Sequence, residues 1–172
     1  MPQLNVPKSG HVAPAAVAGW QWLPFSDALY RRRIQEAMQI INTRIIGHAR
    51  CNAAFSALPG GLTFAQVWAD PTIWISYDPV NTAGRFGATL NRREVTVSQY
   101  CCRMGRWTLV ATLIHEFAHV NGADGISADA ERVLQSCMMG AHYDATIIGQ
   151  LRAAPREPLL VASRPVARKG HV

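Results

Sequence analysis

The sequence predicts an α+β fold, in which helices pack beside a small mixed or antiparallel sheet. Three observations support this prediction. Apolar residues recur at helical spacing over residues 26–51, which indicates a long N-terminal helix. Short runs rich in β-branched and aromatic residues follow between residues 63 and 99. A second apolar helical pattern then occupies residues 107–120, and another helix is expected after it.

Length and composition are those of a single folded domain. Of the 172 residues, 49% are apolar and 16% are charged, which provides enough hydrophobic side chain for one core. We expect residues 1–25 to be an irregular lead-in, residues 26–154 to form the domain, and residues 155–172 to be a flexible basic tail. No apolar run approaches the ~20 residues that span a bilayer, so we expect no membrane association.

The polar N-terminus lacks the pattern of a conventional signal peptide. We therefore expect the protein to be cytoplasmic or to be delivered by a secretion route that needs no such signal. The formal charge of +6 comes largely from arginines at residues 31–33 and in the tail. No recognition motif accompanies this charge, so we expect solvated basic faces and no nucleic-acid partner.

The elements are expected in the following order. Aromatic residues of the lead-in should pack onto the domain. The first helix begins at an N-cap signal formed by Ser26 and Asp27, runs for about six turns, and ends near residues 49–51. Strand signals cover residues 63–68 and, more clearly, 72–77. Residues 85–90 and 94–99 resemble a hairpin. The aromatic residues of the lead-in that are expected to pack onto the domain are Trp20, Trp22 and Phe25.

A helix over residues 107–120 ends at a glycine turn containing Gly122 and Gly125. Residues 127–139 are expected to form the next helix, capped by Ser127 or Asp129, and a short helix is expected at residues 144–151. The four cysteines do not have the spacing of a zinc ribbon. Either Cys51 and Cys137 each form a disulfide with one of the adjacent pair Cys101 and Cys102, or all four are buried thiols of a cytosolic protein.

The segment that carries chemistry is His115-Glu116-Phe117-Ala118-His119. On a helix, residues four apart lie on one face, so the two histidines can present their ring nitrogens to one zinc ion. Glu116, next to the first histidine, can take the proton of a zinc-bound water as that water attacks a peptide carbonyl. This His-Glu-x-x-His pattern on a helix predicts a zinc-dependent peptidase, with Zn²⁺ as its cofactor.

A catalytic zinc normally has three protein ligands and a water molecule. The candidates for the third ligand are Asp124, Asp129, Glu131 and His142. Because Asp129 and Glu131 are two residues apart, they point to different faces of a helix and are not both expected to bind one ion. The residue that does not bind can cap the helix or orient a ligand.

The motif resembles that of the zincin metallopeptidases. The segment Gly125-Ile126-Ser127-Ala128-Asp129 is similar to the Gly-Thr-x-x-Asp element of the deuterolysin-like aspzincins. This resemblance implies a zincin-like fold with Asp129 as the third ligand. Glu131 is the alternative, since the gluzincins take a glutamate from the following helix.

In the aspzincin pattern, a tyrosine and a glycine come three and four residues after the aspartate. Arg132 and Val133 stand at these positions. The oxyanion would then be stabilised by another group, and Tyr143 or His142 can serve, because a phenol or imidazolium near the zinc can take this role.

The predicted function is therefore that of a zinc endopeptidase acting on a protein or peptide. It could be a toxin or effector of a bacterium or phage, or a regulatory protease. A toxin of this kind would need an inhibitor or immunity protein, or a narrow substrate choice. The alternative from another class is a non-catalytic binding protein that is stabilised by zinc and carries a basic tail.

Overall fold

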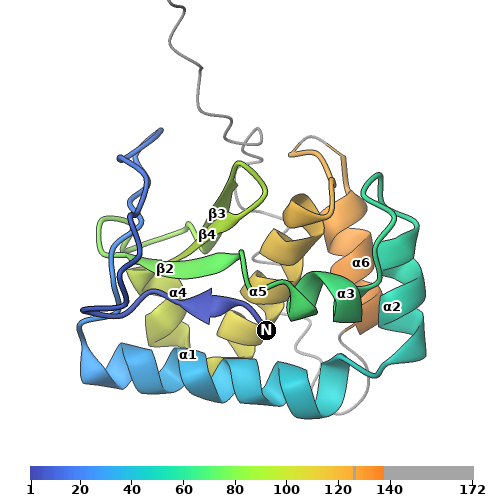
Figure 1. The fold of residues 1–172 in the computed structure, drawn as a ribbon, viewed down its shortest axis with the longest axis horizontal. Helices are drawn as coiled ribbons and strands as arrows, with labels where there is room; N and C mark the ends of the chain where they lie inside the picture. Colours follow the sequence, from blue (N-terminus) through green and yellow to red (C-terminus); the bar gives the residue numbers. More distant parts are fainter. Residues whose placement is uncertain (126, 138–172) are drawn as a thin grey trace, which may run out of the picture.

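The computed structural model describes residues 1–125 and 127–137. Within these residues the fold is α+β, as predicted, with six α-helices, one π-helical segment and a mixed four-stranded sheet (Figure 1). The expected helix at residues 144–151, the tail, His142 and Tyr143 lie outside the described residues. The strands are β1 (Gln3–Leu4), β2 (Trp74–Asp78), β3 (Gly87–Leu90) and β4 (Glu94–Ser98). The helices are α1 (Ala28–Ile40), η1 (Ile41–Ile45), α2 (Ala49–Ser56), α3 (Phe64–Ala69), α4 (Gln99–Met104), α5 (Arg106–Val120) and α6 (Asp129–Cys137).

The sheet has the strand order β1-β2-β4-β3. Strands β1, β2 and β4 run parallel, whereas β3 is antiparallel to β4 and forms an edge of the sheet. The predicted hairpin is confirmed, and its turn places Asn91 and Arg92 at φ values of 51° and 58°. The register Thr89↔Val95 directs these two side chains to the same face of the sheet.

The two faces of the sheet are covered by different parts of the chain. Ile75, Val95 and Val97 belong to the main core, which the helices complete. On the opposite face, Ala88 and Leu90 pack against Trp20 and Trp22 of the lead-in. The lead-in is therefore a layer of the molecule, and the expected burial of Trp20, Trp22 and Phe25 is confirmed.

The first helix differs from the prediction at its C-terminal end. It begins as expected, with the Asp27 side chain accepting a hydrogen bond from the Tyr30 amide. The helical chain then ends at Ile45, and a separate helix, α2, occupies the region where the first helix was predicted to end. The reason is local: His48 is extended, and its ring accepts a hydrogen bond from the Cys51 amide, so that it caps α2.

The strand predicted at residues 63–68 is wrong, because this segment forms α3. Thr63 and Gln66 make a capping box, in which each side chain bonds to the backbone amide of the other residue. This arrangement satisfies two amides at the helix start and favours a helix despite the β-branched and aromatic residues. Helix α4 was not predicted. Ser98 caps it by accepting a hydrogen bond from the Cys101 amide.

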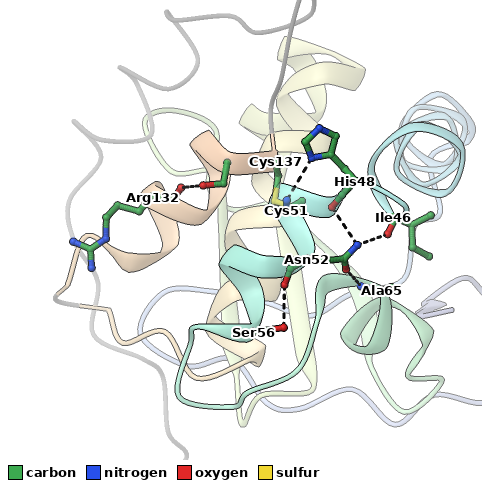
Figure 2. Close-up of a disulfide and its surroundings, with 9 residues drawn as sticks. Ile46, His48, Cys51, Asn52, Ser56, Ala65, Arg132 and Cys137 are labelled. Carbon is green, nitrogen blue, oxygen red and sulfur yellow. Dashed lines mark hydrogen bonds between the residues drawn. A yellow bond between two sulfur atoms is a disulfide. The ribbon is translucent and has the colours of Figure 1, made fainter.

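The predicted pairings of the cysteines are wrong as well. Cys51 on α2 forms a disulfide with Cys137 on α6, with Cα atoms 4.3 Å apart (Figure 2). Cys101 and Cys102 are free and buried. The alternative of four buried thiols therefore holds for Cys101 and Cys102 but not for Cys51 and Cys137, which the packing of α2 against α6 brings together. None of the described helices is both long and apolar enough to cross a membrane.

Candidate metal and catalytic site

The His-Glu-x-x-His segment lies in the C-terminal half of α5, the helix predicted at residues 107–120. Ten residues of this helix are buried, so packing fixes its orientation. His115 and His119 are partly exposed, one turn apart on the same face, while Glu116 is buried. The helix therefore holds two half-buried imidazoles on one face and a buried carboxylate beside them.

The two histidine rings converge on one point. Their Nε2 atoms are 3.2 Å apart, and their planes are inclined at 75°. Two nitrogens that each lie about 2.0–2.1 Å from a zinc ion, at a tetrahedral angle, are roughly 3.3 Å apart. The spacing of the pair therefore fits two ligands of one ion.

His119 is held in the tautomer that metal binding requires. Its Nδ1 is 2.9 Å from the carbonyl oxygen of Ala123, which can only accept a hydrogen bond, so Nδ1 carries a proton; in the neutral ring the lone pair is then on Nε2. The turn that provides this carbonyl is anchored by Asn121. The Asn121 amide donates to the carbonyls of Phe55 and Leu62 at 2.8 Å each. Gly122, at φ 94°, allows the chain to reverse there.

His115 is held in a neutral form. Burial, and secondly the nearby His119, lower the pKa of His115 to about 3. Its Nδ1 is buried and has no hydrogen-bond partner among the described residues. A neutral imidazole can bind a metal ion, so the donor set of the pair fits zinc.

The sheet holds Glu116 in place. The hydroxyl of Thr89 on β3 lies 2.8 Å from Glu116 Oε2 and 3.1 Å from the Glu116 carbonyl oxygen, and it can donate to either. β3 approaches α5 this closely because residue 87 is glycine. A Cβ at Gly87 would lie 2.8 Å from the Thr112 side chain and 3.0 Å from Cγ of Glu116. The carboxylate is therefore fixed beside the histidine pair by a strand that comes from elsewhere in the chain.

Among the residues that the structure describes, none is placed as a third ligand of the pair. Within residues 1–125 and 127–137, no three His, Cys, Asp or Glu side chains lie close enough together to hold a metal ion. Asp124 is exposed and accepts a hydrogen bond from the Ser127 amide. Asp129 begins α6 and bonds to Ser127 and Arg132. Glu131 is two residues further along α6, and its Oε2 is buried without a partner among the described residues.

Sequence reasoning missed Thr89, Gly87 and the Ala123 carbonyl as parts of the site. A threonine and a glycine in a short strand carry no local signal of contact with a helix about 27 residues further on. The Ala123 carbonyl could have been anticipated, since Gly122 reverses the chain toward the end of α5 and metal-binding histidines usually donate their second N–H to an oxygen. No protein-family model, curated protein or solved structure matches the chain.

Proposed function

We propose that this chain is a zinc-dependent endopeptidase with a zincin-like arrangement of α5, α6 and the edge strand β3. The observation that carries the proposal is the 3.2 Å separation of the His115 and His119 Nε2 atoms, with the buried Glu116 carboxylate on the same turn of helix. A site that only stabilises the fold with zinc has no use for such a carboxylate. A hydrolase requires one as a general base.

His115 and His119 would hold the metal ion, together with a carboxylate from α6. Bound zinc supplies Lewis-acid chemistry, since it lowers the pKa of a water ligand to about 7 and polarises a carbonyl. The Glu116 carboxylate would accept the proton of the attacking water and then deliver it to the leaving peptide nitrogen. Its hydrogen bond to Thr89 keeps the carboxylate oriented for both transfers.

The substrate is expected to be a protein or peptide in extended form. β3 is an edge strand of the described sheet and lies next to α5. An edge strand presents unpaired backbone groups to which an extended peptide can add as a further strand. A peptide bound in this way would pass beside Glu116, since Thr89 in the middle of β3 contacts that residue. We also propose that the enzyme acts as a toxin, an effector or a regulatory protease. If it is a toxin, its partner would be an inhibitor or immunity protein.

Glu116→Gln tests the proposal. The amide cannot accept the proton, so we expect cleavage of casein and of a mixed peptide library to fall by about 10²–10⁴-fold or more. Zinc content, measured by elemental analysis, should stay at one ion per chain, and the circular dichroism spectrum should not change. The matched control is Glu36→Gln, which alters a partly exposed carboxylate of α1 that pairs with Arg32. This control should cleave as the wild type does.

Two results would contradict the proposal. A wild type that binds no zinc after reloading would show that the histidine pair is not a metal site. Zinc binding without cleavage in both wild type and Glu116→Gln would support the alternative, a non-catalytic zinc-stabilised binding protein.

A further inference from the structure

We propose that Glu131, and not Asp129, is the third protein ligand of the metal, and that Asp129 instead fixes the start of α6. The inference deepens the proposed function and depends on it. It departs from the aspzincin resemblance, which implies Asp129. The structural basis is a difference in how the two carboxylates of α6 are satisfied.

Asp129 is fully engaged as a residue of the helix start. Its Oδ2 accepts a hydrogen bond from the Ser127 hydroxyl at 2.8 Å, and its Oδ1 pairs with the Arg132 guanidinium. The side chain is 29% exposed, so water can also reach it. A negative charge in the first turn is favourable to the helix. To bind a metal through either oxygen, Asp129 would have to give up or share the partner that this oxygen now has.

Glu131, unlike Asp129, has a carboxylate oxygen without a hydrogen-bond partner among the described residues. This oxygen, Oε2, is buried. A buried carboxylate oxygen without a partner is costly unless a cation or a proton reaches it. Helix α6 packs against α5. Among the described residues of these two helices, one more buried side-chain atom has no hydrogen-bond partner, namely Nδ1 of His115 in the histidine pair. Both atoms belong to residues of the candidate metal site.

Helical spacing places the two carboxylates on different sides of α6, so they are not both expected to turn toward the pair. Ala130, Val133 and Leu134 form the buried face of the helix. Positions 129 and 131 are about 200° apart around the axis and therefore flank this face on opposite sides. Figure 1 shows α6 lying beside α5. The structure does not group Glu131 with the histidines, so the proposal requires its side chain to turn toward them when the ion binds.

Metal affinity in isosteric variants distinguishes the two carboxylates. The zinc affinities of Glu131→Gln and Asp129→Asn would be measured by competition with a chromophoric chelator. The visible spectrum of each cobalt-substituted variant would be recorded as well. Second-shell changes weaken metal binding by roughly 10–100-fold, and loss of a direct ligand should exceed that range. We expect Glu131→Gln to do so and to change the cobalt bands. Asp129→Asn should stay within the range and keep the bands.

Thermal unfolding adds a readout that a merely structural role would not produce. In metal-free protein, Glu131→Gln removes an unpaired buried carboxylate and should raise the melting temperature. In zinc-loaded protein the same variant should melt below the wild type. Asp129→Asn should lower the melting temperature in both forms, because it weakens the bonds to Ser127 and Arg132.

The outcomes separate this inference from the proposed function. Loss of metal in Asp129→Asn with retention in Glu131→Gln would overturn the inference and leave the peptidase proposal standing. Retention in both variants would also overturn it, since the third ligand would then lie outside α6. If the metal-free Glu131→Gln protein melts below the wild type, Glu131 has a structural role instead. A wild type without zinc would remove the proposed function itself.

Discussion

At the scale of single residues, Thr89 is the contact through which the sheet controls the candidate catalytic carboxylate. Its hydroxyl reaches both the side chain and the carbonyl of Glu116. The approach depends on Gly87, two residues earlier, where a Cβ would also come within 2.9 Å of the Thr96 carbonyl oxygen. In the proposed function Thr89 would therefore be a positioning residue, and its effect should appear in the rate of the chemical step.

Thr89→Val keeps the shape of the side chain and removes the hydroxyl. A hydrogen bond to a charged group is worth about 1.5–3 kcal/mol, which corresponds to roughly 10–100-fold if it is expressed in the transition state. We expect kcat to fall within that range with little change in KM, as measured by peptide cleavage. Zinc content should be unchanged.

Thr89→Ser should restore most of the rate, because the hydroxyl is present again. Thr43→Val is a matched control, since the hydroxyl of Thr43 bonds to the Gln39 carbonyl at an exposed position. An unchanged kcat in Thr89→Val would show that the bond to Glu116 has no role in catalysis.

At the scale of elements, the disulfide ties α6, which carries the candidate third ligands Asp129 and Glu131, to α2. Figure 2 shows Cys51 and Cys137 joined between these helices. Asn52, the residue after Cys51, donates to the carbonyls of Ile46 and His48 and accepts from the Ala65 amide at 2.9 Å. The disulfide thus links α6 to a region that is itself well connected. Such a bond is typical of proteins that mature in an oxidising environment.

The two free cysteines should be unreactive in the folded protein. Burial raises the pKa of Cys102 to about 12, and burial together with the neighbouring Cys102 raises the pKa of Cys101 well above its usual range. The thiolate is the reactive form, so iodoacetamide at pH 7.5 should label neither residue. Mass spectrometry should find two labelled cysteines after unfolding, and four when the protein is also reduced.

Replacing both Cys51 and Cys137 by alanine should lower the free energy of unfolding by roughly 2–5 kcal/mol, as loss of a native disulfide does in small domains. It should also weaken zinc binding, because α6 would then be held by packing alone. Labelling of four cysteines after unfolding without reduction would show that the disulfide does not form.

At the scale of the whole molecule, the lead-in closes one face of the sheet. The His11 ring stacks on Trp74 of β2 with centroids 4.1 Å apart, and its Nε2 lies 3.0 Å from the Glu94 carboxylate of β4. Both side chains are largely buried, with exposed fractions of 6% and 17%. The Trp22 indole donates to the Glu94 carbonyl at 3.3 Å. The lead-in, which was expected to be irregular, contains the short strand β1 and is attached to the sheet by polar and stacking contacts as well.

This attachment should depend on pH. Burial raises the pKa of Glu94, while His11 acts in the opposite direction. A raised folded pKa means that the stabilising contribution of Glu94 is complete below its usual pKa of 4.5 and is lost as the pH rises through the folded value. Glu94→Gln is uncharged at every pH. The variant should therefore gain stability relative to the wild type between pH 4 and pH 7.5.

Urea denaturation of zinc-free protein at the two pH values measures this difference. Glu36→Gln, at a partly exposed position, serves as the control and should change the free energy of unfolding by about the same amount at both pH values. If Glu94→Gln instead loses stability relative to the wild type as the pH rises, the ion pair with His11 outweighs the cost of burial.

The elements predicted correctly from sequence are those with a strong local pattern. The apolar periodicity of residues 107–120 identified α5, and spacing by four residues placed His115 and His119 on one face, because helical geometry depends only on nearby residues. Residues 63–68 had a weaker and shorter pattern, and the bonds between Thr63 and Gln66 decided in favour of a helix. The N-cap of α1 was within one residue of the prediction, at Asp27.

The sequence by itself determined the α+β class, the helix that bears the motif and the identity of its two histidines and glutamate. Only the tertiary structure decided that Thr89 holds Glu116, that Asn121 anchors the turn behind His119, and that Cys51 pairs with Cys137 across 86 residues. The physical reason is that helical periodicity acts within a few residues. Contacts between distant segments depend on how all the elements pack together, and no local pattern encodes that packing.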